Sequence, residues 1–221
     1  SRTLEAHGYT VAILPQPDWN KEEPFLQFGT PRLGFLVSAG NIDSMVNHYS
    51  VNKRRRDKDY YTDDGVMGKR PDRATIVYTQ KLRKLFPNVP IIIGGVEASL
   101  RRLGHYDYWD DKVRRSILID SQADLLLYGM GERTIIETAD SLNAGIAAKD
   151  ITFIKGSCYK TKDISLLDDY VLLPSFEEIK NDKYKYAKSF KAQHDNIDAI
   201  TAENGKGAEL SVENATSGMT A

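Results

Sequence analysis

Cysteine is nearly absent from the sequence, and its scarcity excludes several kinds of site. Cys158 is the single cysteine among 221 residues, so the chain cannot form an internal disulfide or supply the several thiolates of a zinc or iron–sulfur site. The histidines show neither HExxH nor i, i+4 spacing; they are His7, His48, His105 and His194. Because metal sites depend on such ligand spacing, we expect no metal site within this chain.

The sequence also lacks long apolar runs and a large net charge. No apolar run approaches the roughly 20 residues of a membrane span, and the opening SRTLEAHGYTVAILP lacks the long apolar core of a signal peptide. The formal net charge is -1 with 28% charged residues, which gives no reason to expect nucleic acid as a partner. We therefore expect a cytoplasmic protein that binds neither membrane nor nucleic acid.

What the sequence does contain is an alternation of short apolar runs with longer amphipathic stretches. This alternation is typical of βα units, so it predicts an α/β fold of the Rossmann-like, doubly wound kind with a mostly parallel sheet. Runs made almost only of Val, Ile and Leu predict interior strands that are covered on both faces. The predicted strands are residues 9–15, 32–38, 89–95, 123–129 and, with a less apolar run, 151–160.

Four amphipathic stretches predict helices, at residues 71–86, 111–122, 132–146 and 175–193. Pro71 is favoured in a first helical turn, and Gly145 is typical of a helix end. Ser175 precedes Glu178 by three residues, the spacing of a capping box. Each of these signals marks one end of a predicted helix, in three of the four stretches.

Two polar segments set the domain organisation. Residues 47–73 form a long connection rich in Lys, Arg, Asp and Tyr, and connections of that length inside compact domains are usually functional or mobile. Residues 196–221 contain few large apolar side chains, so we expect them to form a disordered tail. The Rossmann-like domain is therefore predicted over residues 1–195.

Small residues follow three of the predicted strands. Gly94 and Gly95 end one strand, and Gly129 and Gly131 precede Glu132 at the end of another. The strand predicted at residues 32–38 also ends in small residues, in the string SAG. Ligands of open parallel sheets bind outside the carboxyl ends of the strands, so these ends predict a crevice. Tight βα turns also use glycine, however, and that structural explanation is the commoner one for each site alone.

Two basic stretches raise the question of an anionic ligand. Lys69 and Arg70 stand near a predicted helix N-terminus, where free N–H groups favour an anion. Interleaved aspartates offer the alternative of surface ion pairs. The run KRRR at residues 53–56 is followed at once by DKD, so we interpret it as a solvated loop and not as a nucleic-acid arm.

The stretch HYDYWDD holds the densest group of aromatic side chains. His105, Tyr106, Tyr108 and Trp109 would suit stacking on a flat ligand, anchoring the loop to the sheet, or forming a domain interface. No nucleophile or metal-ligand partner stands at a recognisable spacing from His105. We therefore favour an interface for the three aromatic residues.

Four long strings carry a resemblance to a known family. The strings SAGNIDSMVNHYS, GKRPDRATIVYTQKLRK, VPIIIGGVEASLRRLGHYDYWDDKVRRSILID and ADLLLYGMGERTIIE resemble the N-terminal domain of the YgiQ-like radical SAM proteins, an uncharacterised family. The resemblance covers about residues 1–194, and it implies that the first βα unit of the family is truncated here. The glycine-rich ends are more distantly similar to cobalamin-binding Rossmann-like domains.

The resemblance implies that a separate domain carries the catalytic cofactor. In that family a following C-terminal barrel carries a CxxxCxxC motif that holds a [4Fe-4S] cluster and cleaves S-adenosylmethionine. This chain has no such motif, so we expect it to hold no cofactor itself and to be inactive alone, because three thiolates are needed for the cluster. Cobalamin is a further implication, weakened by the truncated first unit.

The resulting functional expectation is an accessory domain that binds or positions an unknown small-molecule substrate or covers the catalytic barrel. A non-catalytic interaction module is the alternative, and a cobalamin carrier is a third. Glu97 and Glu132 could bind a hydroxyl-rich ligand or simply cap helices. The candidate ligand-binding residues are Gly94, Gly95, Glu97, Arg101, His105, Gly129, Gly131 and Glu132, with Lys69 and Arg70 for an anion.

Overall fold

The fold is described from a computed structural model that covers residues 1–165, 167, 170–196 and 208–211. The chain divides into two compact units, and each is described by itself. The first unit comprises residues 1–102 and 117–160, and the second comprises residues 103–116 and 161–221. Of the tail predicted from residue 196, only Asn196 and residues 208–211 lie within the described part.

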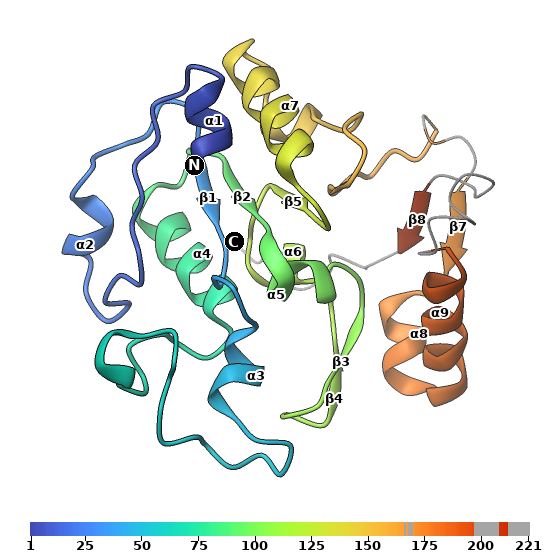
Figure 1. The fold of residues 1–221 in the computed structure, drawn as a ribbon. Coiled ribbons are helices and arrows are strands. Elements are labelled where there is room, and N and C mark those ends of the chain that lie inside the picture. Colours follow the sequence, from blue (N-terminus) through green and yellow to red (C-terminus); the bar gives the residue numbers. More distant parts are fainter. Residues whose placement is uncertain (166, 168–169, 197–207, 212–221) are drawn as a thin grey trace, which may run out of the picture. The chain divides into compact units, whose positions relative to one another are not determined.

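A four-stranded sheet forms the centre of the first unit, in the order β1-β2-β5-β6. Figure 1 labels its three parallel strands, β1, β2 and β5. Strands β1, β2 and β5 are parallel, whereas β6 is antiparallel to β5. Their bounds are Phe35–Val37 for β1, Ile91–Ile93 for β2, Leu125–Leu127 for β5 and Ser157–Cys158 for β6. The structure thus confirms an α/β fold with a mostly parallel sheet, and the two most apolar strands are interior ones.

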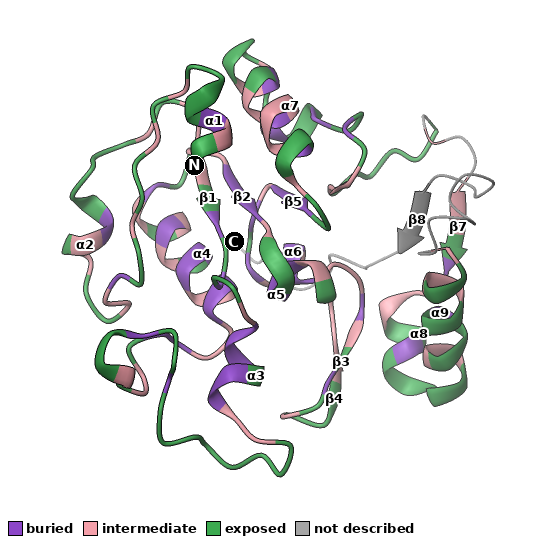
Figure 2. Cartoon of the chain, viewed as in Figure 1, coloured by how far each residue is buried: buried purple, intermediate pink, exposed green. Residues whose placement is uncertain are grey.

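Helices cover both faces of the sheet because side chains alternate along each strand. Ile91 and Ile93 pack into one apolar cluster with Tyr78 and Leu82 of α4 (Ala74–Leu85). Ile92 packs into the other cluster, which includes Ile135 of α7 (Glu132–Asn143). The strands β2 and β5 are buried along their whole length, as Figure 2 shows. Helices on both faces of the sheet are therefore needed to remove these strands from water.

The predicted strand at residues 9–15 is wrong. This segment is not assigned to any strand, because no neighbouring backbone within the described residues pairs with it. A cavity of about 1640 Å³ is lined both by this segment and by all three residues of β1. β1 is an edge strand of the sheet, and Leu36 at its centre is half exposed. A strand-like sequence without a hydrogen-bonding neighbour does not form a strand.

Two helix predictions need correction within the first part of the chain. Helix α4 begins at Ala74 and not at Pro71, because Arg73 takes a left-handed conformation with φ +52° that ends the helical path. The stretch 111–122 is not one helix: it divides into strand β4 (Lys112–Arg114) and helix α6 (Ile117–Asp120). The helix predicted from residue 132 is confirmed as α7, and Gly145 just beyond it has φ +86°.

The second unit contains two small sheets and two helices. An antiparallel hairpin joins β3 (His105–Asp107) to β4, and a parallel pair joins β7 (Tyr170–Leu173) to β8 (Ala208–Ser211). The helix predicted over 175–193 is two helices, α8 (Phe176–Asn181) and α9 (Lys183–Asp195). They separate at Asp182, whose extended backbone and side chain cap α9. The predicted capping box of Ser175 and Glu178 is present at the start of α8.

Short elements complete the described part of the chain. They are α1 (Arg2–Ala6), α2 (Glu23–Leu26), α3 (Ser44–His48), α5 (Gly95–Leu100) and two 3-10 turns, at Asp63–Gly65 and Ala148–Asp150. Among the described residues, no helix has the length and apolar character needed to cross a membrane. The helix α5 follows β2 directly and brings its residues to the carboxyl edge of the sheet.

Candidate functional site

The paired glycines after β2 lie where neighbouring strand ends approach closely. A Cβ atom on Gly94 would lie 3.2 Å from the carbonyl oxygen of Leu127, and one on Gly95 would lie 3.2 Å from Cβ of Ser38. Gly95 also has φ +80°, a conformation that other residues resist. The two glycines therefore let the ends of β1, β2 and β5 pack side by side.

The glycines after β5 have a different environment. No atom lies within 4 Å of the Cβ position of either Gly129 or Gly131. Met130 between them is 88% exposed, and the N–H of Gly129 donates to Oγ of Ser99 on α5 at 3.3 Å. The space over the β5–α7 junction is therefore open, and the backbone of the junction is hydrogen-bonded to α5.

Apolar and aromatic side chains are exposed around these junctions. Val96 and Leu100 on α5 are both exposed, and so is Tyr128 at the end of β5. The guanidinium of Arg102 lies over the Tyr128 ring, 5.0 Å from its centroid. We call the residues 96, 100, 128 and 130 the open edge. Their exposure provides apolar surface for a contact that is not made within the first unit.

Glu97 joins two helices from within the core. One carboxylate oxygen accepts from the N–H of Ser44 at 2.9 Å and from its hydroxyl at 2.6 Å. The other accepts from the N–H of Thr75 at 2.9 Å. Since Ser44 opens α3 and Thr75 lies in the first turn of α4, the side chain of Glu97 satisfies free donors of both helices.

Arg101 is likewise engaged within the fold. Its Nη1 pairs with the carboxylate of Asp43 and donates to the carbonyl oxygen of Glu97. Asp43 in turn caps α3 by accepting from the N–H groups of Met45 and Val46. The charge of Arg101 therefore stabilises the start of α3 through its capping residue.

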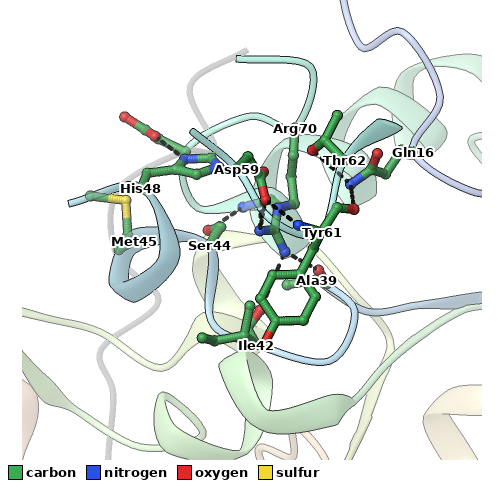
Figure 3. Close-up of polar contacts among 12 residues, drawn as sticks. Gln16, Ala39, Ile42, Ser44, Met45, His48, Asp59, Tyr61, Thr62 and Arg70 are labelled. Atoms are coloured by element: carbon green, nitrogen blue, oxygen red, sulfur yellow. Dashed lines mark hydrogen bonds and ion pairs between the residues drawn. The ribbon is translucent and has the colours of Figure 1, made fainter. Parts of the chain in front are cut away.

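A buried ion pair anchors the long polar connection to the end of β1 (Figure 3). Arg70 donates from Nη2 to both carboxylate oxygens of Asp59 at 3.3 Å, and from Nη1 to the carbonyl oxygen of Ala39 at 3.0 Å. The side chain of Asp59 is fully buried and also accepts from the N–H of Tyr61 at 2.9 Å. The connection is thus an ordered part of the fold.

His48 lies between two carboxylates in the same cluster. Its Nε2 is 3.5 Å from Asp59 and its Nδ1 is 2.7 Å from Asp72. The Tyr49 hydroxyl also donates to Asp72, at 2.6 Å. Burial alone would raise the pKa of each aspartate, but the hydrogen bonds and cations around them hold both pKa values below the ordinary range. We call His48, Asp59, Arg70 and Asp72 the buried ionic cluster.

The remaining predicted residues are distributed over several places. Lys69 is exposed and donates to the carbonyl oxygen of Asp63 at 3.2 Å, whereas its neighbour Arg70 is buried. Both residues line the cavity beside β1. Glu132 is exposed at the first position of α7. The glycines, Glu132 and α5 therefore lie at the strand ends, whereas Lys69 and Arg70 lie at the cavity beside β1.

The aromatic stretch belongs to the second unit, in strand β3 and in the turn that joins β3 to β4. The hydroxyl of Tyr106 pairs with Asp111, and its N–H donates to the Tyr186 hydroxyl at 3.1 Å. Tyr108 and Trp109 form an edge contact with ring centroids 5.9 Å apart. His105 in β3 approaches the carbonyl oxygen of Leu103, 3.2 Å from Nδ1; Tyr106 and Tyr108 are exposed, while Trp109 is half-buried. The hairpin thus holds its aromatic side chains in defined positions.

Sequence reasoning missed the buried ionic cluster. Its members come from α3 and from widely spaced positions of a connection that reads as uniformly polar. The one available signal was the length of that connection, since the buried polar groups of a long ordered segment need hydrogen-bonding partners. Within the described residues, no group of three or more His, Cys, Asp or Glu side chains is arranged to hold a metal ion.

Comparisons with known proteins place these features in a family. A family model described as radical SAM N-terminal matches residues 1–210. A UPF0313 protein of Clostridium perfringens is 55% identical over 201 residues, which is 90% of this chain and 30% of that protein. A UPF0313 protein of Clostridium botulinum is 53% identical over 199 residues, 90% of this chain and 31% of that protein.

The chain therefore spans about three tenths of the length of these relatives. No solved structure matches it. The family match extends over most of the chain and includes the strand ends, the buried ionic cluster and the hairpin. On that match, the chain belongs to the family of radical SAM N-terminal domains.

Proposed function

We propose that this chain is an accessory module of a longer radical SAM protein, and that its open edge contacts the remaining chain where the substrate is handled. The observation that carries the proposal is the junction after β5, where Met130 is 88% exposed between two glycines that face open space. Sheets of this kind receive ligands at their carboxyl ends. The relatives extend well beyond the matched part, which provides a contact partner.

The chain offers the physical properties that such a module requires. Its open edge is rigid, because the strand ends pack closely and Glu97 holds α3 and α4 to α5 from within. Exposed apolar side chains at a rigid edge favour association, since little side-chain ordering opposes the burial of their surface. The module would thereby shield a reacting substrate from water.

The cofactor chemistry of the family does not fit this chain. A [4Fe-4S] cluster that cleaves S-adenosylmethionine needs three thiolates and an open iron position. Cys158 is the single cysteine, and it is half-buried in β6, where it pairs with Leu126. We therefore assign the cluster and S-adenosylmethionine to the C-terminal barrel, and binding or positioning of substrate to this module. Cobalamin stays a prediction of the resemblance.

Calorimetry tests the proposal directly. The 221-residue chain is titrated with the separately produced remainder of the full-length protein, and Met130→Glu is compared with the unchanged chain. We expect Met130→Glu to weaken association at least about tenfold, because it adds a charge at the apolar contact. Phe153→Glu, at another exposed apolar position of the first unit, is the matched control. Equal affinities for all three chains would contradict the proposal.

The β3–β4 hairpin supports a second candidate, a non-catalytic docking module. Tyr106 and Tyr108 are each 43% exposed on this hairpin, and aromatic residues with polar tips are enriched among interface anchors. In the same titration, Trp109→Ala would then weaken association about tenfold without lowering the melting temperature of the chain. A large fall in the melting temperature with unchanged association would instead identify Trp109 as a structural anchor.

A further inference from the structure

A second surface stands out within the long polar connection. Residues 50–61, which we call the basic loop, contain Lys53, Arg54, Arg55, Arg56 and Lys58, all of them exposed. The loop is ordered by its backbone: the N–H of Ser50 donates to the carbonyl of Arg54 at 2.8 Å, and that of Arg56 donates to the carbonyl of His48 at 2.8 Å. The cationic side chains are therefore presented from a fixed backbone.

The fold buries one of the two negative charges that the sequence places among these cations. The loop contains two acids, Asp57 and Asp59. Asp59 turns inward and is fully buried against Arg70. Of the exposed charges in residues 50–61, five cations and one aspartate remain, a net of +4. Sequence spacing indicated a neutralised loop, but the burial of Asp59 makes its surface strongly basic.

Several of these cations are available for an external anion. Within the part of the chain that the structure describes, Arg54, Arg56 and Lys58 form no ion pair. Arg55 differs, because it acts electrostatically on Asp72. The three available cations occupy alternate positions along an ordered segment. Such an arrangement suits a ligand with several regularly spaced anionic groups.

Aromatic rings follow the cations directly. Tyr60 is 83% exposed, and Tyr61 is about half exposed with its ring 5.9 Å from the guanidinium carbon of Arg70. An exposed tyrosine beside unpaired cations provides a flat face on which a base can stack while the cations contact the phosphates. A duplex keeps its bases stacked on one another, so this combination favours a single strand.

We propose that the basic loop binds single-stranded nucleic acid, with Arg54, Arg56 and Lys58 contacting phosphates and Tyr60 stacking on a base. An acidic peptide or an anionic lipid surface would use the cations but would not need the exposed ring. The inference is independent of the proposed function of the open edge, because it concerns different residues.

Fluorescence anisotropy with a labelled single-stranded RNA of about 12 nucleotides tests the inference on the 221-residue chain. Affinity is measured at several salt concentrations. The triple variant Arg54→Ala, Arg56→Ala and Lys58→Ala should lower the slope of log affinity against log salt by about 2, since each lost phosphate contact on a single strand lowers it by about 0.7. Tyr60→Ala should weaken binding at least about fivefold and leave the slope unchanged.

The controls separate this surface from general charge. The triple variant Lys149→Ala, Lys155→Ala and Lys162→Ala removes the same charge from exposed positions outside the loop and should bind as the unchanged chain does. Melting temperatures confirm that each variant is folded. Absence of RNA binding at about 50 mM salt, or equal binding by both triple variants, would overturn the inference. So would equal competition by polyglutamate or by phosphatidylglycerol vesicles together with no effect of Tyr60→Ala.

Discussion

At the scale of single residues, Glu97 and Glu132 occupy similar positions in the sequence but differ in what their side chains contact. Each lies just after a glycine-rich strand end. Glu97 is buried and accepts three hydrogen bonds from two helix starts, while Glu132 is exposed at the start of α7. Their positions alone do not reveal this difference, because it depends on where α3 and α4 approach α5.

Glu97→Gln should lower the free energy of unfolding by about 2 kcal/mol, because hydrogen bonds to a charged group are worth about 1.5–3 kcal/mol and an amide cannot accept through both atoms. The matched control Glu132→Gln should change it by less than about 0.5 kcal/mol, as exposed substitutions do. Urea denaturation measures both values. Equal effects would show that Glu97 does not hold the helices together.

Because of the buried ionic cluster, we expect the free energy of unfolding to fall in acid. The folded pKa values of Asp59 and Asp72 lie below the ordinary value of 3.8, so the folded state binds fewer protons than the unfolded state near that pH. Their contribution is complete above that pH and is lost as the pH falls through the lowered values. Urea denaturation between about pH 2 and pH 6 should therefore show a steep fall below about pH 4.

Asp59→Asn identifies the source of that fall. The substitution leaves the buried Arg70 charge without its partner, so it should cost about 3–5 kcal/mol at neutral pH. It should also reduce the dependence of stability on acid pH, because one of the two depressed groups is gone. If the variant shows the same acid dependence as the unchanged chain, other carboxylates cause it.

At the scale of elements, the ends of β2 and β5 use glycine for different reasons. Gly95 and Gly129 both have positive φ, so an alanine at either position should cost about 1–2 kcal/mol. Gly95→Ala should cost about 1 kcal/mol more, because its Cβ would meet Ser38, whereas the Cβ of Gly129→Ala meets nothing within 4 Å. Thermal unfolding compares the two variants.

A Ser38→Gly background provides the control for that contact. It removes the Cβ that Gly95→Ala would meet, so the difference between the two alanine variants should largely disappear in this background. A difference that persists would mean that backbone strain, and not close approach of β1 and β2, sets the requirement for Gly95.

The elements also show what sequence could predict. Strands β2 and β5 were predicted because uninterrupted Ile and Leu runs are buried on both faces. Residues 9–15 carry the same kind of pattern, but a strand exists only with a paired neighbour, and no local signal reveals one. The stretch 111–122 failed because β4 pairs with β3, a tertiary contact that overrides helical periodicity.

The candidate site was predictable only in part for the same reason. The glycines were found because their turn chemistry is local. The pairing of Arg70 with Asp59 and of His48 with Asp72 was not, since these contacts join residues 11 and 24 positions apart. Three of the four residues lie in a connection with little regular structure. The burial of Asp59 also makes the surface of the basic loop positive, whereas the sequence alone indicated a neutralised loop.

At the scale of the whole molecule, the net charge is only -1, but two surfaces of the chain differ strongly in charge and polarity. The open edge is apolar and lies beside glycines, with Met130 as its most exposed residue, whereas the basic loop concentrates positive charge. Relatives are more than three times as long as the matched part, and we propose that the first surface contacts the remainder of such a longer chain. The central claim is that this remainder covers the open edge.

Hydrogen exchange tests that claim most directly, by comparing the 221-residue chain alone with the same residues inside the full-length protein. We expect amides of residues 94–100 and 128–132 to exchange at least about tenfold more slowly in the full-length protein, because the contact removes their access to solvent and suppresses local opening. Residues 145–153, outside the open edge, should exchange equally in both. Unchanged exchange at the open edge would contradict the account.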